Sequence, residues 1–177
     1  MCLIGPDARV WRHWGFYTRS VQIPELGPRG EGWVAIQLLL FGAIAACGFV
    51  GVYWPRSVEG FAVVLGLILA LAGAIELVLG VLALGSSLTP LPRPRPGAEF
   101  RTGGPFRLVR HPIYGGLILV ALGWSVAEAP LALVPTAALA VLFDFKSRRE
   151  EAWLEEAYPE WAAYAARTPH RFVPWLY

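Results

Sequence analysis

Two long stretches of this chain contain almost no charge, and they limit the folds that it can adopt. Residues 33–53 form a run of 21 without an acidic or basic side chain, and residues 61–84 form a run of 24 whose one charge is Glu76. As a helix, the first run would be about 31 Å long, close to the thickness of a bilayer core of about 30 Å. Only 16% of the chain is charged, whereas an ordinary soluble domain has roughly 25%. The sequence therefore predicts an integral membrane protein.

Two shorter apolar runs follow, at 113–127 and 131–143, and Pro130 separates them. Each is near the lower length limit for crossing a bilayer. We expect a helical hairpin that crosses the membrane and returns, and a hairpin that only dips into the membrane is the alternative.

The predicted fold is an all-α polytopic membrane helix bundle in a single domain. It has four membrane segments, the last two a short helical hairpin, plus a cytoplasmic C-terminal helix. The expected parts begin with an interfacial N-terminal segment (1–32), span 1 (33–53) and span 2 (61–84). A cytoplasmic cofactor loop (85–112), span 3 (113–127), span 4 (131–145) and a cytoplasmic C-terminal helix with its tail (146–177) follow. Aromatic residues mixed with arginine at 10–17 suit an interfacial anchor.

The basic residues set the expected orientation. Fourteen of the 15 lie before the first span, between the second and third, or after the fourth, and Arg56 is the exception. With four crossings these three stretches share one side of the membrane. The positive-inside rule then places both termini and the cofactor loop in the cytoplasm.

Glycines recur every seven residues in the second span, at Gly66, Gly73 and Gly80. Small residues on one helix face allow two backbones to approach closely in lipid. Glu76 lies on the same stripe and should face the bundle interior. It is either a neutral acid bonded to a neighbouring helix or a polar contact of a functional site. The same spacing recurs in the third span, at Gly116 and Gly123.

Ionisable residues gather where the third span begins and where the fourth ends. His111 precedes a proline and should be extended, while Pro112 suits the first position of a helix. Such a helix end favours an anion, and Tyr114 adds a ring and a hydroxyl. S-adenosyl-L-methionine, which carries a carboxylate, an ammonium, a ribose and an adenine, fits this set of groups. The predicted cofactor-binding residues are Gly103, Gly104, His111, Pro112, Tyr114, Glu150 and Glu151.

Taken singly, these residues have plainer explanations. Arg107 and Arg110 fit the positive-inside rule, Gly103 and Gly104 fit a turn, and Glu150 with Glu151 fits the solvated start of a helix. Their joint occurrence at the ends of two membrane segments favours a functional site.

The same residues resemble the isoprenylcysteine carboxyl methyltransferase family, a superfamily of membrane methyltransferases that includes phospholipid N-methyltransferases. Members resemble Gly-Pro-Tyr-Arg-x-x-Arg-His-Pro-x-Tyr-x-Gly, followed later by Glu-Glu-x-x-Leu and an aromatic tail that ends in arginine and proline. This chain reads Gly104-Pro105-Phe106-Arg107-Leu108-Val109-Arg110-His111-Pro112-Ile113-Tyr114-Gly115-Gly116, then Glu150-Glu151-Ala152-Trp153-Leu154. It departs from the pattern at Phe106, which lacks the tyrosine hydroxyl.

The resemblance implies methyl transfer from S-adenosylmethionine to a lipophilic small molecule or lipid that reaches the site from the membrane. A carboxylate acceptor would need an arginine, whereas an amine or thiol acceptor would depend more on a base or a desolvating pocket. The predicted catalytic residues are Arg110, Arg148, Arg149 and Arg171.

Two other functions compete with methyl transfer. One is an NADPH-dependent membrane reductase of the sterol-reductase type, and the other is a non-enzymatic membrane scaffold whose arginines serve topology and lipid contacts. Cys2 and Cys47 form no metal-binding pattern, so we expect no metal. A net charge of +2 does not favour nucleic acid as a partner. The oligomeric state stays open.

Overall fold

The computed structural model describes residues 23–174, and within that range it is all-helical and contains no strand. The predicted all-α class is therefore confirmed, while the predicted anchor at 10–17 lies outside the described residues. The five α-helices are α1 (Glu31–Cys47), α2 (Arg56–Leu84), α3 (Pro112–Ala127), α4 (Leu133–Ala157) and α5 (Trp161–Arg167), and the short 3-10 helices are η2 (Gly85–Ser87), η3 (Gly104–Arg107) and η4 (Pro130–Ala132).

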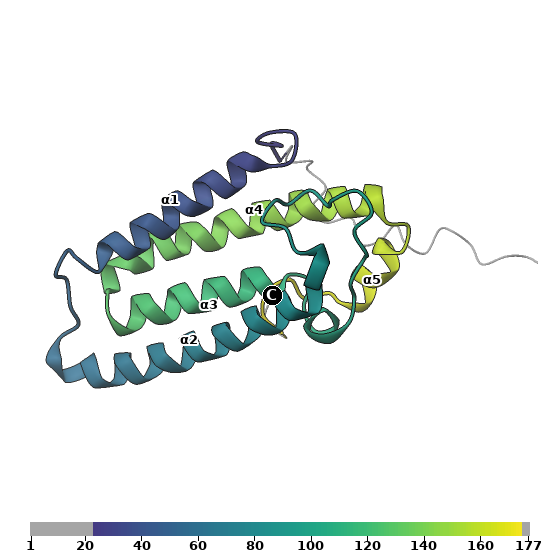
Figure 1. Cartoon of the computed structure of the whole chain (residues 1–177). Coiled ribbons are helices and arrows are strands. Elements are labelled where there is room, and N and C mark those ends of the chain that lie inside the picture. Colours follow the sequence, from purple (N-terminus) through teal and green to yellow (C-terminus); the bar gives the residue numbers. More distant parts are fainter. Residues whose placement is uncertain (1–22, 175–177) are drawn as a thin grey trace, which may run out of the picture.

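The four long helices run alternately in opposite directions, with α1 beside α4 and α2 beside α3 (Figure 1). The connections at 48–55 and 128–132 lie at one end of the bundle. The loop at 85–111, the last turns of α4, α5 and the tail gather at the other end (Figure 1). This end brings together the segments in which the sequence places its motifs.

Helices α2 and α3 pack through their glycines. A Cβ added at Gly66 would lie 2.5 Å from the carbonyl oxygen of Gly123, and one added at Gly73 would lie 2.7 Å from that of Gly116. Both distances are too short for a side chain, so the two backbones touch. The predicted glycine stripe is confirmed, and so is its counterpart on α3.

Glu76 faces α3, as its place on the stripe predicts. Its Oε1 atom would lie 2.9 Å from a Cβ added at Gly115. That oxygen is buried and has no hydrogen-bond partner among residues 23–174. Glu76 is not part of the cavity wall described below.

Two helical stretches are long and apolar enough to cross a membrane, Arg56–Ser87 and Pro130–Ala157. Helices α1 and α3 are apolar but have only 17 and 16 residues, about 25 and 24 Å, which is less than the bilayer core. Four membrane segments therefore remain a prediction.

Several helix bounds differ from the predicted segments, and α2 begins at Arg56 and not at 61. Helix α1 ends at Cys47 and not at 53, because the chain turns through Gly48 and Gly51, and Gly51 has a φ of 74°. Helix α4 continues unbroken to Ala157, so the predicted boundary between 145 and 146 falls inside one helix. The polar C-terminal turns of α4 are a direct extension of the apolar part at 131–145.

Candidate active site

The tail of the chain fixes the Arg110-His111-Pro112 segment. His111 is the N-cap of α3, with φ of −129° and ψ of 64°, so it is non-helical but not fully extended as predicted; Pro112 occupies the first turn, as predicted. The backbone amide of Arg110 donates to the His170 carbonyl at 2.9 Å, and that of His111 donates to the Arg171 carbonyl at 2.8 Å. These two amides are used within the protein and do not contribute to the anion site predicted at this helix end.

Glu151 joins the loop, α4 and the tail. Its Oε1 atom accepts hydrogen bonds from Arg110 Nε at 2.9 Å and Arg171 Nε at 3.2 Å, and it lies 3.1 Å from His111 Nε2. Its Oε2 atom accepts from Arg171 Nη2 at 3.1 Å. Burial raises the pKa of Glu151, but the hydrogen bonds and charges of His111 and Arg171 outweigh burial and hold this pKa well below its usual value. Glu151 is therefore ionised and surrounded by protein donors.

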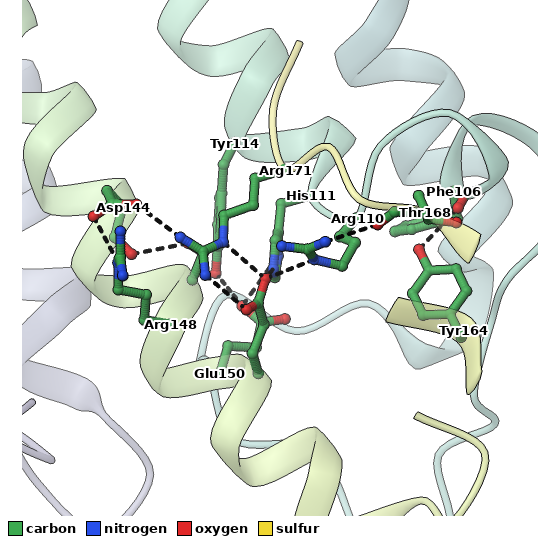
Figure 2. Close-up of polar contacts among 12 residues, drawn as sticks. Phe106, Arg110, His111, Tyr114, Asp144, Arg148, Glu150, Tyr164, Thr168 and Arg171 are labelled. Carbon is green, nitrogen blue, oxygen red and sulfur yellow. Dashed lines mark hydrogen bonds and ion pairs between the residues drawn. The ribbon is translucent and has the colours of Figure 1, made fainter. Parts of the chain in front are cut away.

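The cluster continues along α4 to Asp144 (Figure 2). Arg171 Nη1 donates to Asp144 Oδ1 at 3.1 Å, and Arg148 Nε donates to Asp144 Oδ2 at 2.8 Å. Asp144 was not predicted as a site residue, because it appears in the sequence as one charge at the end of an apolar run. It holds Arg171 from the side opposite Glu151.

On its other side the cluster reaches the tail and η3 (Figure 2). Arg110 Nη1 donates to the carbonyls of Thr168 and Pro169 at 2.7 and 2.8 Å. The Tyr164 hydroxyl donates to the Phe106 carbonyl at 2.8 Å. Burial raises the pKa of Tyr164, which keeps the hydroxyl protonated as a donor.

A cavity of about 330 Å³ lies beside this cluster, within the range of small-molecule sites, roughly 300–1,000 Å³. His111, Tyr114 and Glu150 line it. The Tyr114 hydroxyl donates to Glu150 Oε2 at 2.6 Å, and the other Glu150 oxygen has no hydrogen-bond partner among residues 23–174. The His111 ring stacks on Tyr114, with the ring centroids 5.4 Å apart. The cavity thus offers one open carboxylate oxygen beside an ordered aromatic ring.

Aromatic side chains form another part of the wall. Phe100 stacks on Tyr158 at 5.0 Å and meets the edges of Trp161 and Tyr164 at 5.9 and 5.4 Å, and all four line the cavity. Tyr158, Trp161 and Tyr164 follow Glu150-Glu151 in the chain, where the family pattern has its aromatic tail. Phe100 carried no signal, because it stands alone in a loop.

The structure separates the predicted residues into three groups. The cavity wall includes Arg110, His111, Pro112, Tyr114 and Glu150, while Glu151 and Arg171 lie in the adjacent polar cluster. Four predicted residues lie away from the wall. Gly103 and Gly104 are exposed, and Arg148 pairs with Asp144. Arg149 pairs with Glu25 and covers the Trp153 ring.

Lys146 and Gln37 are two further wall residues that the sequence did not reveal. Lys146 was counted only as a positive-inside charge, although it lies one helical turn before Glu150 and so shares its face of α4. Gln37 lies in an apolar run far from any motif, and nothing in its local sequence distinguishes it.

Comparison with known proteins agrees with the placement of the motifs. A family model described as phospholipid methyltransferase matches residues 55–160, which contain α2, α3, α4 and the loop between α2 and α3.

Three curated relatives match parts of the chain. The cobalt-zinc-cadmium resistance protein CzcN of Cupriavidus metallidurans is 40% identical over 73 residues, which is 40% of this chain and 34% of that protein. The nickel-cobalt-cadmium resistance protein NccN of Alcaligenes xylosoxydans xylosoxydans is 34% identical over 44% of this chain and 38% of its own length. The Delta(14)-sterol reductase of Mus musculus is 31% identical over 46% of this chain and 20% of its own length. The chain thus spans well under half the length of these three relatives.

Proposed function

Since the chain belongs to the phospholipid methyltransferase family, integral-membrane methyltransferases related to the isoprenylcysteine carboxyl methyltransferases, we propose that it is an S-adenosylmethionine-dependent methyltransferase. It acts on a lipophilic or membrane-accessible acceptor at the cytoplasmic face of the membrane. The observation that carries this proposal is the cavity in which Tyr114 and Glu150 meet beside the Arg110-His111-Pro112 segment.

The donor set of the cavity fits S-adenosylmethionine. The open oxygen of Glu150 is an acceptor suited to the ammonium or to a ribose hydroxyl. The rings of Phe100, Tyr158 and Trp161 provide flat apolar surfaces suited to the adenine. When bound, this compound supplies a methyl group on a sulfonium centre.

The residues of the polar cluster act by holding the cavity wall. Glu151 fixes the side chains of Arg110 and His111, and His111 fixes the ring of Tyr114 by stacking. A wall held in place before binding orients the reacting groups and excludes water, and both effects favour a displacement reaction.

The charge distribution supports the proposed orientation with four membrane segments. Within residues 23–174, every lysine and arginine except Arg56 belongs to the segment before α1, the loop between α2 and α3, the second half of α4, or α5 and the tail. These segments lie at the end of the bundle that carries the cavity (Figure 1). A water-soluble cofactor requires a cytoplasmic opening, and the positive-inside rule assigns this end to the cytoplasm.

Calorimetric binding of S-adenosylhomocysteine to the detergent-purified chain tests the proposal. We expect micromolar affinity in the wild type and a loss of about tenfold or more in Tyr114→Ala, which removes the stacked ring and the bond to Glu150. Arg56→Met, at the opposite end of the bundle, is the control and should bind normally. A folded wild-type chain that does not bind S-adenosylhomocysteine would refute the proposed function.

The similarity to a sterol reductase supports a second candidate, an NADPH-dependent reductase. It is weaker, because the match covers only 20% of that protein. Binding of NADPH in place of S-adenosylhomocysteine in the same titration would favour it.

A further inference from the structure

Lys146 is a buried cation that the polar cluster does not use. Its side chain lies in α4 with only 1% of the residue exposed to solvent, yet it lines the cavity. Its Nζ donates to Gln37 Oε1 at 2.7 Å and to the Pro90 carbonyl at 3.4 Å. It also lies over the Tyr114 ring, 5.0 Å from its centroid. All three contacts are with neutral groups.

The other cations of the cavity wall are already paired. Arg110 bonds to Glu151, and Arg101 forms an ion pair with Glu99. No carboxylate of residues 23–174 lies within ion-pair distance of Lys146 Nζ; Glu150, one turn further along α4, accepts from Tyr114 instead. The charge of Glu150 acts on this ammonium only from beyond ion-pair distance. A buried ammonium without a direct counter-ion is costly, so an anion that enters the cavity would gain by pairing with it.

We propose that Lys146 binds the reactive group of the methyl acceptor, and that this group is an anion, a carboxylate or a thiolate, and not an amine. This inference rests on the proposed methyltransferase function and narrows its acceptor. The acceptor anion forms its new bond to the methyl carbon with its own electron pair. The carbon–sulfur bond of the donor breaks and sulfur keeps that pair, so no proton has to be removed. Lys146 would repel a protonated amine, and Glu150, the carboxylate of the same wall, is assigned to the ammonium or ribose of S-adenosylmethionine and not to the acceptor.

Gln37 is the positioning residue for Lys146. Gln37 is the residue of α1 that contacts the lysine. Helix α1 lies outside the region at 55–160 that the family model matches. The neutral amide oxygen of Gln37 orients the ammonium without neutralising it. A glutamate at this position would form an internal ion pair and compete with any bound anion.

Calorimetric titration of the detergent-purified chain with octanoate and with octylamine tests this proposal without measuring turnover. The two ligands share a chain length and differ in charge. We expect the wild type to bind octanoate about tenfold or more tightly than octylamine. Lys146→Met should abolish the preference, and Gln37→Glu should weaken octanoate binding although the lysine remains. Arg56→Met, a cation removed at the far end of the bundle, should behave as the wild type.

S-adenosylhomocysteine binding, measured on the same samples, separates the two proposals. If octanoate binding falls further than S-adenosylhomocysteine binding in both Lys146→Met and Gln37→Glu, both proposals stand. If the wild type binds S-adenosylhomocysteine but prefers octylamine or neither ligand, the role of Lys146 is refuted alone. If it prefers octanoate and does not bind S-adenosylhomocysteine, the methyltransferase function fails. Should Lys146→Met fail to fold, Gln37→Glu decides, and unchanged octanoate binding in that variant overturns the proposal.

Discussion

The glycine-lined contact between α2 and α3 and the polar cluster around Glu151 are built in opposite ways. In the first, the two helices approach closely because glycines have no side chain, and the backbone of Gly116 lies against that of Gly73. In the second, long charged side chains from the loop, α4 and the tail join these segments through hydrogen bonds and ion pairs. The first contact therefore breaks when atoms are added and the second when atoms are removed. The first serves the bundle, and the second shapes the cavity.

The largest effect is expected from Gly116→Val. The new Cβ would lie 2.6 Å from the Leu77 backbone nitrogen and 2.7 Å from the Gly73 carbonyl oxygen, so a whole helix has to move. We expect a loss of more than about 3 kcal/mol of stability, measured by thermal unfolding in detergent. Gly42→Val is the matched control, because nothing lies within 4 Å of its added Cβ. Equal melting temperatures for the two variants would contradict backbone contact between α2 and α3.

Glu151→Ala should have the next largest effect. It leaves Arg110, His111 and Arg171 without their shared carboxylate, and removing one partner of a buried ion pair costs about 3 kcal/mol. The same unfolding measurement applies. A variant as stable as the wild type would show that the cluster does not hold the loop to the tail.

Acid should weaken the cluster by protonating Glu151. Its pKa in the folded chain is held below the unfolded value of about 4.3. The resulting stabilisation is complete above that value and is lost as the pH falls below it towards the folded pKa. The melting temperature of the wild type should therefore fall more steeply between about pH 5 and pH 3 than that of Glu151→Gln. Parallel curves for the two proteins would argue against this linkage. The effect should be smaller than that of Glu151→Ala, because the neutral acid keeps some hydrogen bonds.

The first of the two glutamates should behave differently. Glu150 lines the cavity and forms one hydrogen bond, which its Oε2 atom accepts from Tyr114. We expect Glu150→Gln to reduce S-adenosylhomocysteine affinity about tenfold while the melting temperature changes little, because a charged acceptor is lost but the side-chain volume is kept. A large loss of stability with normal affinity would exchange the roles assigned to Glu150 and Glu151.

This division between neighbouring glutamates marks the limit of what the sequence predicts. The glycine stripe and the helix start at Pro112 were predictable, because periodicity and proline geometry act locally. Consecutive residues on a helix point about 100° apart, and the path of the tail determines which glutamate meets Arg171 and which faces the cavity. The same long-range contacts made Asp144 and Gln37 unpredictable. Lys146 was overlooked because topology alone already explained a lysine at that position.

The smallest effect separates two hydrogen bonds that join the C-terminal part of the chain to the loop. The buried Tyr164 hydroxyl donates to the Phe106 carbonyl, and the Tyr158 hydroxyl donates to the Ala98 carbonyl, both at 2.8 Å. Tyr164→Phe leaves a buried carbonyl without its donor and should cost about 1 kcal/mol. Tyr158 is only partly buried, so water replaces its bond, and Tyr158→Phe should cost less. Equal losses of stability for the two variants in thermal unfolding would mean that water reaches the bond at Tyr164 as readily as the bond at Tyr158. The polar cluster would then not seal this side of the cavity.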